Sequence, residues 1–182
     1  MAKQYPQLEA QHIDFIQQQP LFFMGTATAD SRVNVSPKGL DSLRIISPER
    51  ILWLNLTGSG NESAAHVALN SRMTLMFCAF TGNPVILRVY GQASVVHPYD
   101  EAWSELRANF PPYPGARQIF DLVVELVQTS CGFGVPFLEP AGDRPTLNTW
   151  AEAKGTAGIE AYWRSKNQFT IDGIPTHILP PA

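Results

Sequence analysis

The sequence predicts a mainly β protein, in which an antiparallel sheet of six or seven strands forms a small barrel with flanking helices. Two observations predict this class. Short runs of apolar, β-branched and aromatic residues recur from residue 21 to residue 129. Brief turns rich in Gly, Pro, Asn and Asp separate most of these runs, so strands that follow one another in sequence are expected to pair in opposite directions.

Each strand has its own signal. The first two predict a hairpin, because both are strand-like and the Asp30-Ser31 pair between them favours a turn. The continuous apolar runs predict buried strands, and we expect a bend at Gly91 within the longest one. The predicted strands are residues 21–28, 33–36, 43–46, 51–56, 73–80, 85–96 and 117–129.

Helical patterns stand at the start, between strands and at the end of the chain. The first is amphipathic and stops at Pro20, because proline disfavours helix in the residue before it. Trp150 and Trp163, in the last two, are typical of core or interface positions. The predicted helices are residues 8–19, 62–69, a segment that starts at Pro98, 146–154 and 158–166.

The loop that leads into the second predicted helix has the character of an anion site. Gly58 and Gly60 permit a tight backbone and place no side chain in the way of a ligand. The first turn of the helix offers unpaired N–H groups and a dipole that favours negative charge. Thr57, Ser59 and Asn61 add side-chain donors. The loop therefore predicts a phosphate site.

A second interpretation of this loop needs no ligand. Ser59 and Glu62 have the spacing of a capping box, in which each side chain satisfies a backbone N–H of the other residue. The loop also matches neither common nucleotide pattern, because no Gly-Lys-Ser/Thr follows and Ser63 stands where a third glycine would fall. The residues alone leave both interpretations open.

Composition excludes several classes of protein. The 182 residues are 45% hydrophobic and 16% charged, which indicates a single globular domain over residues 1–182 with surface covered by another copy of the chain. A net charge of -3 argues against nucleic acid as a partner. The N-terminus lacks an apolar signal core, and no apolar run would span a membrane, so we expect a cytoplasmic protein.

The cysteines and histidines predict no metal site, because their spacing matches no common ligand set. We expect Cys78 to pack as a small hydrophobe and Cys131 to be buried in the glycine-rich turn at residues 130–136, to which the sequence assigns no role. His66 is expected to be packed or solvated rather than catalytic. Arg88 either pairs with a buried carboxylate or lines a cofactor, and the sequence does not decide between them.

A family resemblance rests on four stretches taken in order, residues 22–28, 32–39, 54–61 and 87–91. They give a hairpin that ends in Lys, a strand that enters the anion loop, and a second hairpin that ends in Gly. With them the chain resembles the pyridoxamine 5'-phosphate oxidase-like group, the FMN-binding split barrels. The resemblance implies an antiparallel split β-barrel that binds FMN at the interface of a homodimer.

The resemblance also implies which residues hold the cofactor. The hairpin strand would meet the flavin ring or its phosphate, the anion loop would hold the phosphate, and a C-terminal helical segment at about 146–182 would cover a flavin edge. Carried over to this chain, these residues are Val33, Asn34, Val35, Ser36 and Lys38 on the strand, Thr57, Gly58, Ser59, Gly60 and Asn61 in the loop, and Trp163.

The chain departs from the oxidase in ways that bear on the ligand. Where the oxidase has an Arg-Lys pair near the phosphate, this chain has Gly60-Asn61. Neutral donors would therefore bind the phosphate, with Arg32, Lys38 or Arg72 as the candidate cations. Ile86 stands where the oxidase has a glutamine. These departures disfavour pyridoxamine phosphate as the substrate.

The predicted function is therefore that of an FMN-dependent oxidoreductase acting on a small molecule that the sequence does not identify. Lys38 is the candidate for a positive charge near the N1/O2 edge of the flavin, where negative charge develops on reduction. Its alternative role is that of a solvated lysine in a Pro-Lys-Gly turn. Two other functions stay open, a non-catalytic flavin-binding protein and a deazaflavin-dependent reductase of the same fold. No side chain is a clear catalytic acid or base.

Overall fold

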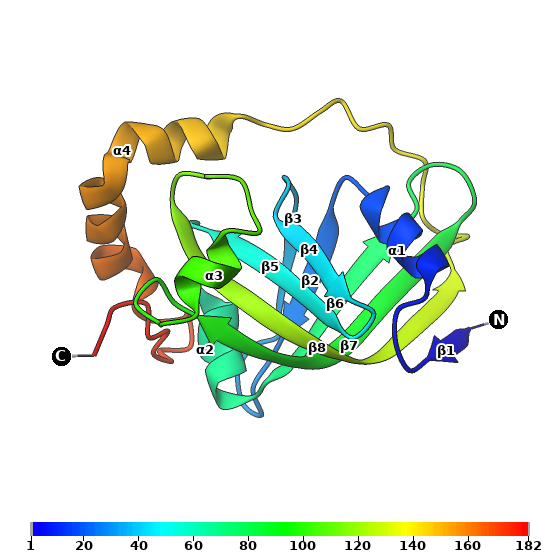
Figure 1. Ribbon diagram of the computed structural model, residues 1–182, viewed down its shortest axis with the longest axis horizontal. Helices are drawn as coiled ribbons and strands as arrows, with labels where there is room; N and C mark the ends of the chain where they lie inside the picture. The colour runs from blue at the N-terminus through cyan, green and yellow to red at the C-terminus, as the bar shows by residue number, and fades with distance from the viewer. Residues whose placement is uncertain (1, 182) are drawn as a thin grey trace.

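The computed structural model describes residues 2–181, which form one antiparallel sheet of eight strands with helices around it (Figure 1). The order along the sheet is β3-β2-β6-β7-β8-β5-β4, and the short β1 pairs with β8. The predicted mainly β, antiparallel class is confirmed. The strands are β1 (Lys3–Tyr5), β2 (Phe22–Thr26), β3 (Asn34–Lys38), β4 (Leu43–Ser47), β5 (Arg50–Leu56), β6 (Arg72–Cys78), β7 (Val85–Val96) and β8 (Ala116–Cys131).

The long strands β7 and β8 run side by side at the centre of the sheet (Figure 1). Their register shifts between Tyr90 and Gly91, which confirms the irregularity expected at Gly91. A Cβ at Gly91 would lie 1.9 Å from the carbonyl oxygen of Val123, so only glycine fits this close approach. The predicted hairpin of β2 and β3 is also confirmed, with Gly25 opposite Val35.

The curved sheet encloses a core of aromatic and aliphatic side chains. Trp53 of β5 stacks on Phe120 of β8 with ring centroids 4.7 Å apart, and Phe22 of β2 lies 5.5 Å from Phe77 of β6. Both contacts join neighbouring strands. Phe22 also lies 6.3 Å from Trp53, and because β2 and β5 are far apart in the sheet order, this contact shows that the sheet curls on itself. Cys78 is buried at the end of β6, as expected.

The helices lie outside the barrel and differ in detail from the predictions. α2 coincides with its predicted range and packs on β2 and β7. α3 is short, because turns occupy the residues after Pro98. The two predicted C-terminal helices are both present within α4, where the non-helical residue Gly155, with a φ of +62°, separates them at a kink. The helices are α1 (Ala10–Gln17), α2 (Glu62–Leu69), α3 (Trp103–Arg107), α4 (Thr146–Tyr162) and the π-helical turn η1 (Trp163–Asn167).

Two sequence-based details are wrong. β1 was not predicted, because three residues with no apolar alternation give no strand signal and are ordered by pairing with β8. Cys131 is exposed rather than buried, because β8 continues through it and turns its side chain outward. Among the described residues, no helix is long and apolar enough to cross a membrane.

Candidate functional site

The loop between β5 and α2 is fixed at its first residue. The backbone N–H and the hydroxyl of Thr57 both donate to the carbonyl of Gly115, each at 2.8 Å. The same hydroxyl accepts a hydrogen bond of 2.8 Å from the indole Nε1 of Trp163, in η1. Thr57 is therefore a buried anchor whose hydroxyl hydrogen is already engaged, and Trp163 reaches the loop directly.

The middle of the loop is oriented by Asn167, the last residue of η1. Its side-chain amide donates to the carbonyls of Gly58 at 3.1 Å and Ser59 at 3.2 Å. These peptides are trans, so each N–H points away from its own C=O. The N–H groups of Ser59 and Gly60 therefore point away from Asn167, toward the exposed side of the loop.

Arg117, near the start of β8, lies beneath this loop with 2% of its surface exposed. Its Nη1 donates to the side-chain oxygen of Asn167 at 2.9 Å and to the carbonyl of Gly58 at 3.4 Å. Its Nη2 reaches the side-chain oxygen of Asn55 at 3.0 Å, in the amide orientation that satisfies both residues. All of these acceptors are neutral, and the Nε of Arg117 has no acceptor among residues 2–181.

The charge of Arg117 is retained despite this burial. Desolvation lowers its pKa to about 10, while Glu62 and Tyr162 act in the opposite direction. An arginine with that pKa is still cationic at neutral pH. No carboxylate in the described part of the chain lies within ion-pair distance of it.

The first turn of α2 continues the loop. The helix starts after Asn61, whose side chain makes no capping hydrogen bond, so the capping box of Ser59 and Glu62 does not form. Asn61 is 3% exposed, and neither its side-chain oxygen nor its nitrogen has a partner among the described residues. The Glu62 carboxylate lies where a Cβ of Gly60 would be. Unpaired polar atoms thus remain at the helix start, as an anion site requires.

The hairpin strand β3 turns its polar residues toward α2. The Asn34 amide donates to the hydroxyl of Ser63 at 3.0 Å and lies 3.3 Å from the hydroxyl of Ser36. Val33 and Val35 are 72% and 63% exposed. An alternating strand normally buries its valines. Here the contact with α2 reverses that pattern and leaves both valines on the surface.

His66 completes this polar contact from within α2. Its Nδ1 lies 3.1 Å from the hydroxyl of Thr26 on β2, and that hydroxyl also donates to Ser63. His66 is 1% exposed, which agrees with the expected packing role. The network ties the start of α2 to the β2–β3 hairpin.

Lys38 ends β3 and turns its ammonium group over the ring of Trp53, 5.1 Å from the ring centroid. Burial, together with the positive charge of Arg117, lowers the pKa of Lys38 to about 8, and Glu62 opposes this shift. The side chain is half-buried rather than freely solvated, so it is not the exposed turn lysine that the sequence also allowed. At neutral pH it is mainly protonated.

A cavity of about 1080 Å³ lies beside Lys38 and the start of the anion loop. Lys38, Trp53, Thr57 and Gly58 border it on the barrel side. Trp150 of α4 borders the other side, together with the extended segment that follows β8 and crosses above the barrel in Figure 1. Thr57 and Gly58, at the start of the anion loop, therefore face the same space as Lys38, whereas Ser59, Gly60 and Asn61 are not among the residues that line it. The space is large enough for a three-ring aromatic ligand.

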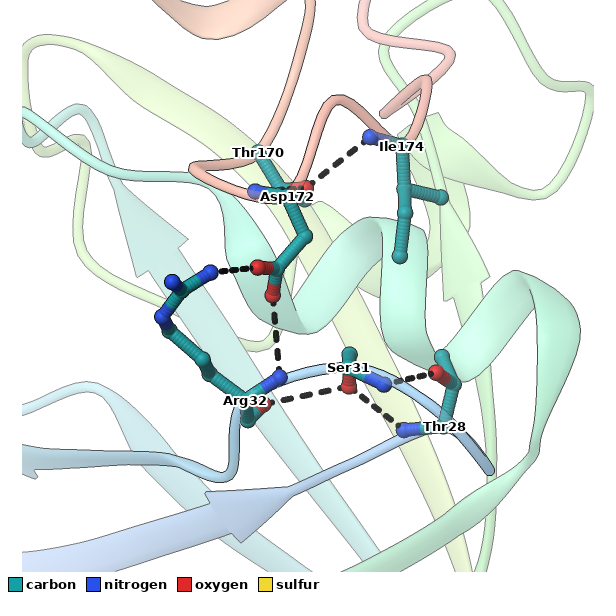
Figure 2. Close-up of polar contacts among 6 residues, drawn as sticks. All are labelled: Thr28, Ser31, Arg32, Thr170, Asp172 and Ile174. Atoms are coloured by element: carbon teal, nitrogen blue, oxygen red, sulfur yellow. Dashed lines mark hydrogen bonds and ion pairs between the residues drawn. The ribbon is translucent and has the colours of Figure 1, made fainter.

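The C-terminal tail is attached to the hairpin as well as to the loop. Asp172 accepts hydrogen bonds from the backbone N–H of Arg32 at 2.9 Å and from its guanidinium, as Figure 2 shows. Arg32 is thus engaged away from the anion loop, and the exposed Arg72 bonds to Asn70. Of the three cations that the sequence offered for the phosphate, Lys38 alone lines the cavity.

Other candidates lie elsewhere. Arg88 donates to the hydroxyl of Ser130 at 3.2 Å, so it neither pairs with a carboxylate nor lines the main cavity. Cys131 borders a second cavity of about 420 Å³ near α1. Sequence reasoning missed Arg117 and Asn167. Arg117 could have been noticed, because it is a charged residue at the start of an otherwise apolar strand. Asn167 gave no such signal in the sequence.

Comparison with known proteins identifies the family. The family model for pyridoxamine 5'-phosphate oxidase matches residues 8–131. The chain belongs to the pyridoxamine 5'-phosphate oxidase family. A curated member, the pyridoxamine 5'-phosphate oxidase family protein ustO of Aspergillus flavus, is 36% identical over 180 residues, covering 89% of this chain and 72% of that protein.

Solved structures share the fold of this pyridoxamine 5'-phosphate oxidase family member at lower identity. HupZ of Group A Streptococcus has a TM-score of 0.53 and 16% identity, covering 67% of this chain and 98% of that one. A candidate pyridoxamine 5'-phosphate oxidase of Lactobacillus delbrueckii has a TM-score of 0.53 and 24% identity, covering 68% of this chain and 94% of that one. The sheet therefore has the split-barrel fold expected from the sequence.

Proposed function

We propose that this family member is a cytoplasmic, homodimeric FMN-dependent oxidoreductase built as a single domain. The observation that supports this most is that one cavity is bordered both by Thr57 and Gly58, at the start of the anion loop, and by Lys38. A loop with outward N–H groups suits the phosphate of a nucleotide. A protonated lysine beside an aromatic cavity suits a ring that gains negative charge on reduction.

The residues present fit FMN on several grounds. Asn61 has buried polar atoms without partners at the start of α2. A Cβ at Gly58 would meet no atom within 4 Å, so this part of the loop is open to a ligand. Ser59 is exposed and its N–H points outward. These features fit a phosphate group, and the aromatic and aliphatic walls of the cavity fit an isoalloxazine ring.

In this proposal the roles divide by element. Residues Ser59, Gly60 and Asn61 hold the phosphate, and Asn34 and Ser36 of β3 offer hydrogen bonds at the hairpin side. FMN supplies hydride or electron transfer when bound. Lys38 is placed to hold a positive charge at the cavity, and Trp150 covers the opposite wall and excludes water. No residue is assigned as a proton donor.

The homodimer is supported by the exposed valines at β3. Val35 lies on the edge strand β3 and Val33 directly precedes this strand, and both side chains have most of their surface exposed. An edge strand with outward valines is prone to pair with, or be covered by, another chain. In the proposed dimer these valines contact the second copy or its flavin. Light scattering coupled to size exclusion should give twice the mass of the 20.1 kDa chain.

The proposal is tested by the visible absorbance spectrum of the protein after incubation with FMN and gel filtration. We expect the bands of oxidised flavin, and bleaching by a suitable reduced donor. Ser59→Asp places a negative charge beside the phosphate and should weaken FMN binding at least tenfold. Ser104→Asp, at an exposed position on α3, is the matched control and should bind as the wild type does.

Two results would count against this function. A colourless protein that does not take up FMN would exclude the cofactor. A flavin spectrum that no nicotinamide or small-molecule donor bleaches would favour the alternative of a non-catalytic flavin-binding protein.

A further inference from the structure

Arg117 is a buried charge whose surroundings do not explain its presence by stability. It is 2% exposed, it is surrounded by neutral oxygens, and no carboxylate among residues 2–181 forms an ion pair with it. A buried charge without a counter-charge is costly, and proteins usually pair or neutralise it. Its position therefore needs an explanation other than stability.

The geometry places this charge directly behind the anion loop. The guanidinium contacts the carbonyl of Gly58 from the inner side, and Asn167 bridges from the guanidinium to the carbonyls of Gly58 and Ser59. The opposite side of the same peptides carries the N–H groups that face outward. An anion on the outer side is thus separated from Arg117 by the thickness of one peptide layer.

The charged side chains close to the loop give it an excess of positive charge. Arg117 and Lys38 are both cationic at neutral pH, and the positive charge of Arg117 lowers the pKa of Lys38. The acidic group that acts on both of them is Glu62, which carries a single negative charge. A net positive charge remains around the loop, and a phosphate dianion would balance it.

We infer that Arg117 is the buried counter-charge of the ligand's phosphate, a positioning residue that makes the loop select phosphorylated over unphosphorylated flavin. This inference rests on the proposed function. Arg117 does not touch the ligand. It attracts the dianion through the loop, and with Asn167 it holds the Gly58 and Ser59 carbonyls inward so that the N–H groups face the phosphate. It replaces the cationic pair that the sequence lacks at Gly60-Asn61.

The test is the ratio of riboflavin to FMN dissociation constants, measured by fluorescence titration of flavin-free protein. The two ligands differ only in the phosphate, so the ratio isolates its contribution. We expect the wild type to prefer FMN strongly. Arg117→Met keeps most of the side-chain volume and removes the charge, and should reduce the preference by roughly tenfold or more. Riboflavin binding should be nearly unchanged.

A matched control and a second variant separate charge from folding. Arg107→Met removes a partly buried arginine on α3 that also bonds only to a carbonyl, and should leave the ratio unchanged. Arg117→Lys retains the charge and should keep most of the FMN preference. Arg117→Met leaves the Asn167 side-chain oxygen and the Gly58 carbonyl without this donor, so its melting temperature is measured to show that it is folded during the titration. If that variant does not fold, Arg117→Gln carries the same measurement.

The outcomes distinguish this inference from the function on which it rests. A wild type that binds neither flavin would refute the proposed function itself. A wild type that prefers FMN, with Arg117→Met keeping the same ratio, would overturn the role of Arg117 alone. A loss of FMN and riboflavin binding by equal factors would also overturn it, because it would show a structural role without phosphate selectivity.

Discussion

The cost of the charge on Lys38 can be measured directly. Its pKa falls from 10.5 to about 8, chiefly because of burial. A fall of that size corresponds to about 3 kcal/mol of folding free energy that the flavin-free protein forgoes while Lys38 is protonated. Replacing Lys38 with Met removes the charge and keeps an unbranched apolar stem in the same space.

We expect Lys38→Met to raise the free energy of unfolding at pH 7 by about 1–2 kcal/mol. This is less than the full electrostatic cost, because the variant loses the contact of the ammonium with the Trp53 ring, worth about 0.5–1 kcal/mol, and solvent screens a half-buried group. The gain depends on pH in a defined way. It is largest below pH 8 and shrinks as pH rises from 8 toward 10.5, because the folded wild type loses the proton before the unfolded chain does.

The assay is urea unfolding of flavin-free wild type and variant at pH 7 and at pH 9.5, followed by tryptophan fluorescence. Lys166→Met, at an exposed position on η1, is the control and should change stability by less than about 0.5 kcal/mol at either pH. A Lys38→Met variant that is less stable than wild type at pH 7, or whose gain is the same at both pH values, would refute the electrostatic reasoning.

Three further predictions follow from single contacts. Gly91→Ala should lower the free energy of unfolding by about 3 kcal/mol, measured in urea, because its Cβ would collide with the Val123 carbonyl; an unchanged midpoint would contradict the bulge. Burial lowers the pKa of His97 to about 4, so wild-type stability should fall as pH drops from 6.5 to 4, whereas His97→Gln should give a flatter profile in acid unfolding. Trp163→Phe removes the hydrogen bond to Thr57 and should weaken FMN binding by about tenfold in a fluorescence titration. A variant that binds FMN as tightly as the wild type would contradict this role of Trp163.

Local patterns predicted most of the fold. The β2–β3 hairpin, α2 and the long β7 follow from periodicity and turn residues, which act over a few neighbouring positions. β1 was not predicted, because its strand conformation comes from pairing with β8, about 125 residues away, rather than from its own residues. The exposure of Val35 was not predicted for a similar reason, because the contact of Asn34 with Ser63 sets the orientation of β3.

The candidate site was predictable in part. Glycines and short polar residues before a helix predict an anion loop from sequence alone, and the first two residues of that loop, Thr57 and Gly58, border the same cavity as Lys38. Arg117 and Asn167 could not be connected to the loop in this way. Both are far from it in sequence and reach it only after the barrel forms and the C-terminal segment folds over it. Residues that act through tertiary contacts are difficult to predict from the local sequence pattern.

The most direct test is a crystal structure of the protein grown with FMN. The account predicts two chains around each flavin, the phosphate within hydrogen-bond distance of the N–H groups of Ser59 and Gly60, and the ring beside Lys38. A flavin phosphate bound elsewhere, or a loop whose outer N–H groups are covered by the protein's own side chains, would contradict it.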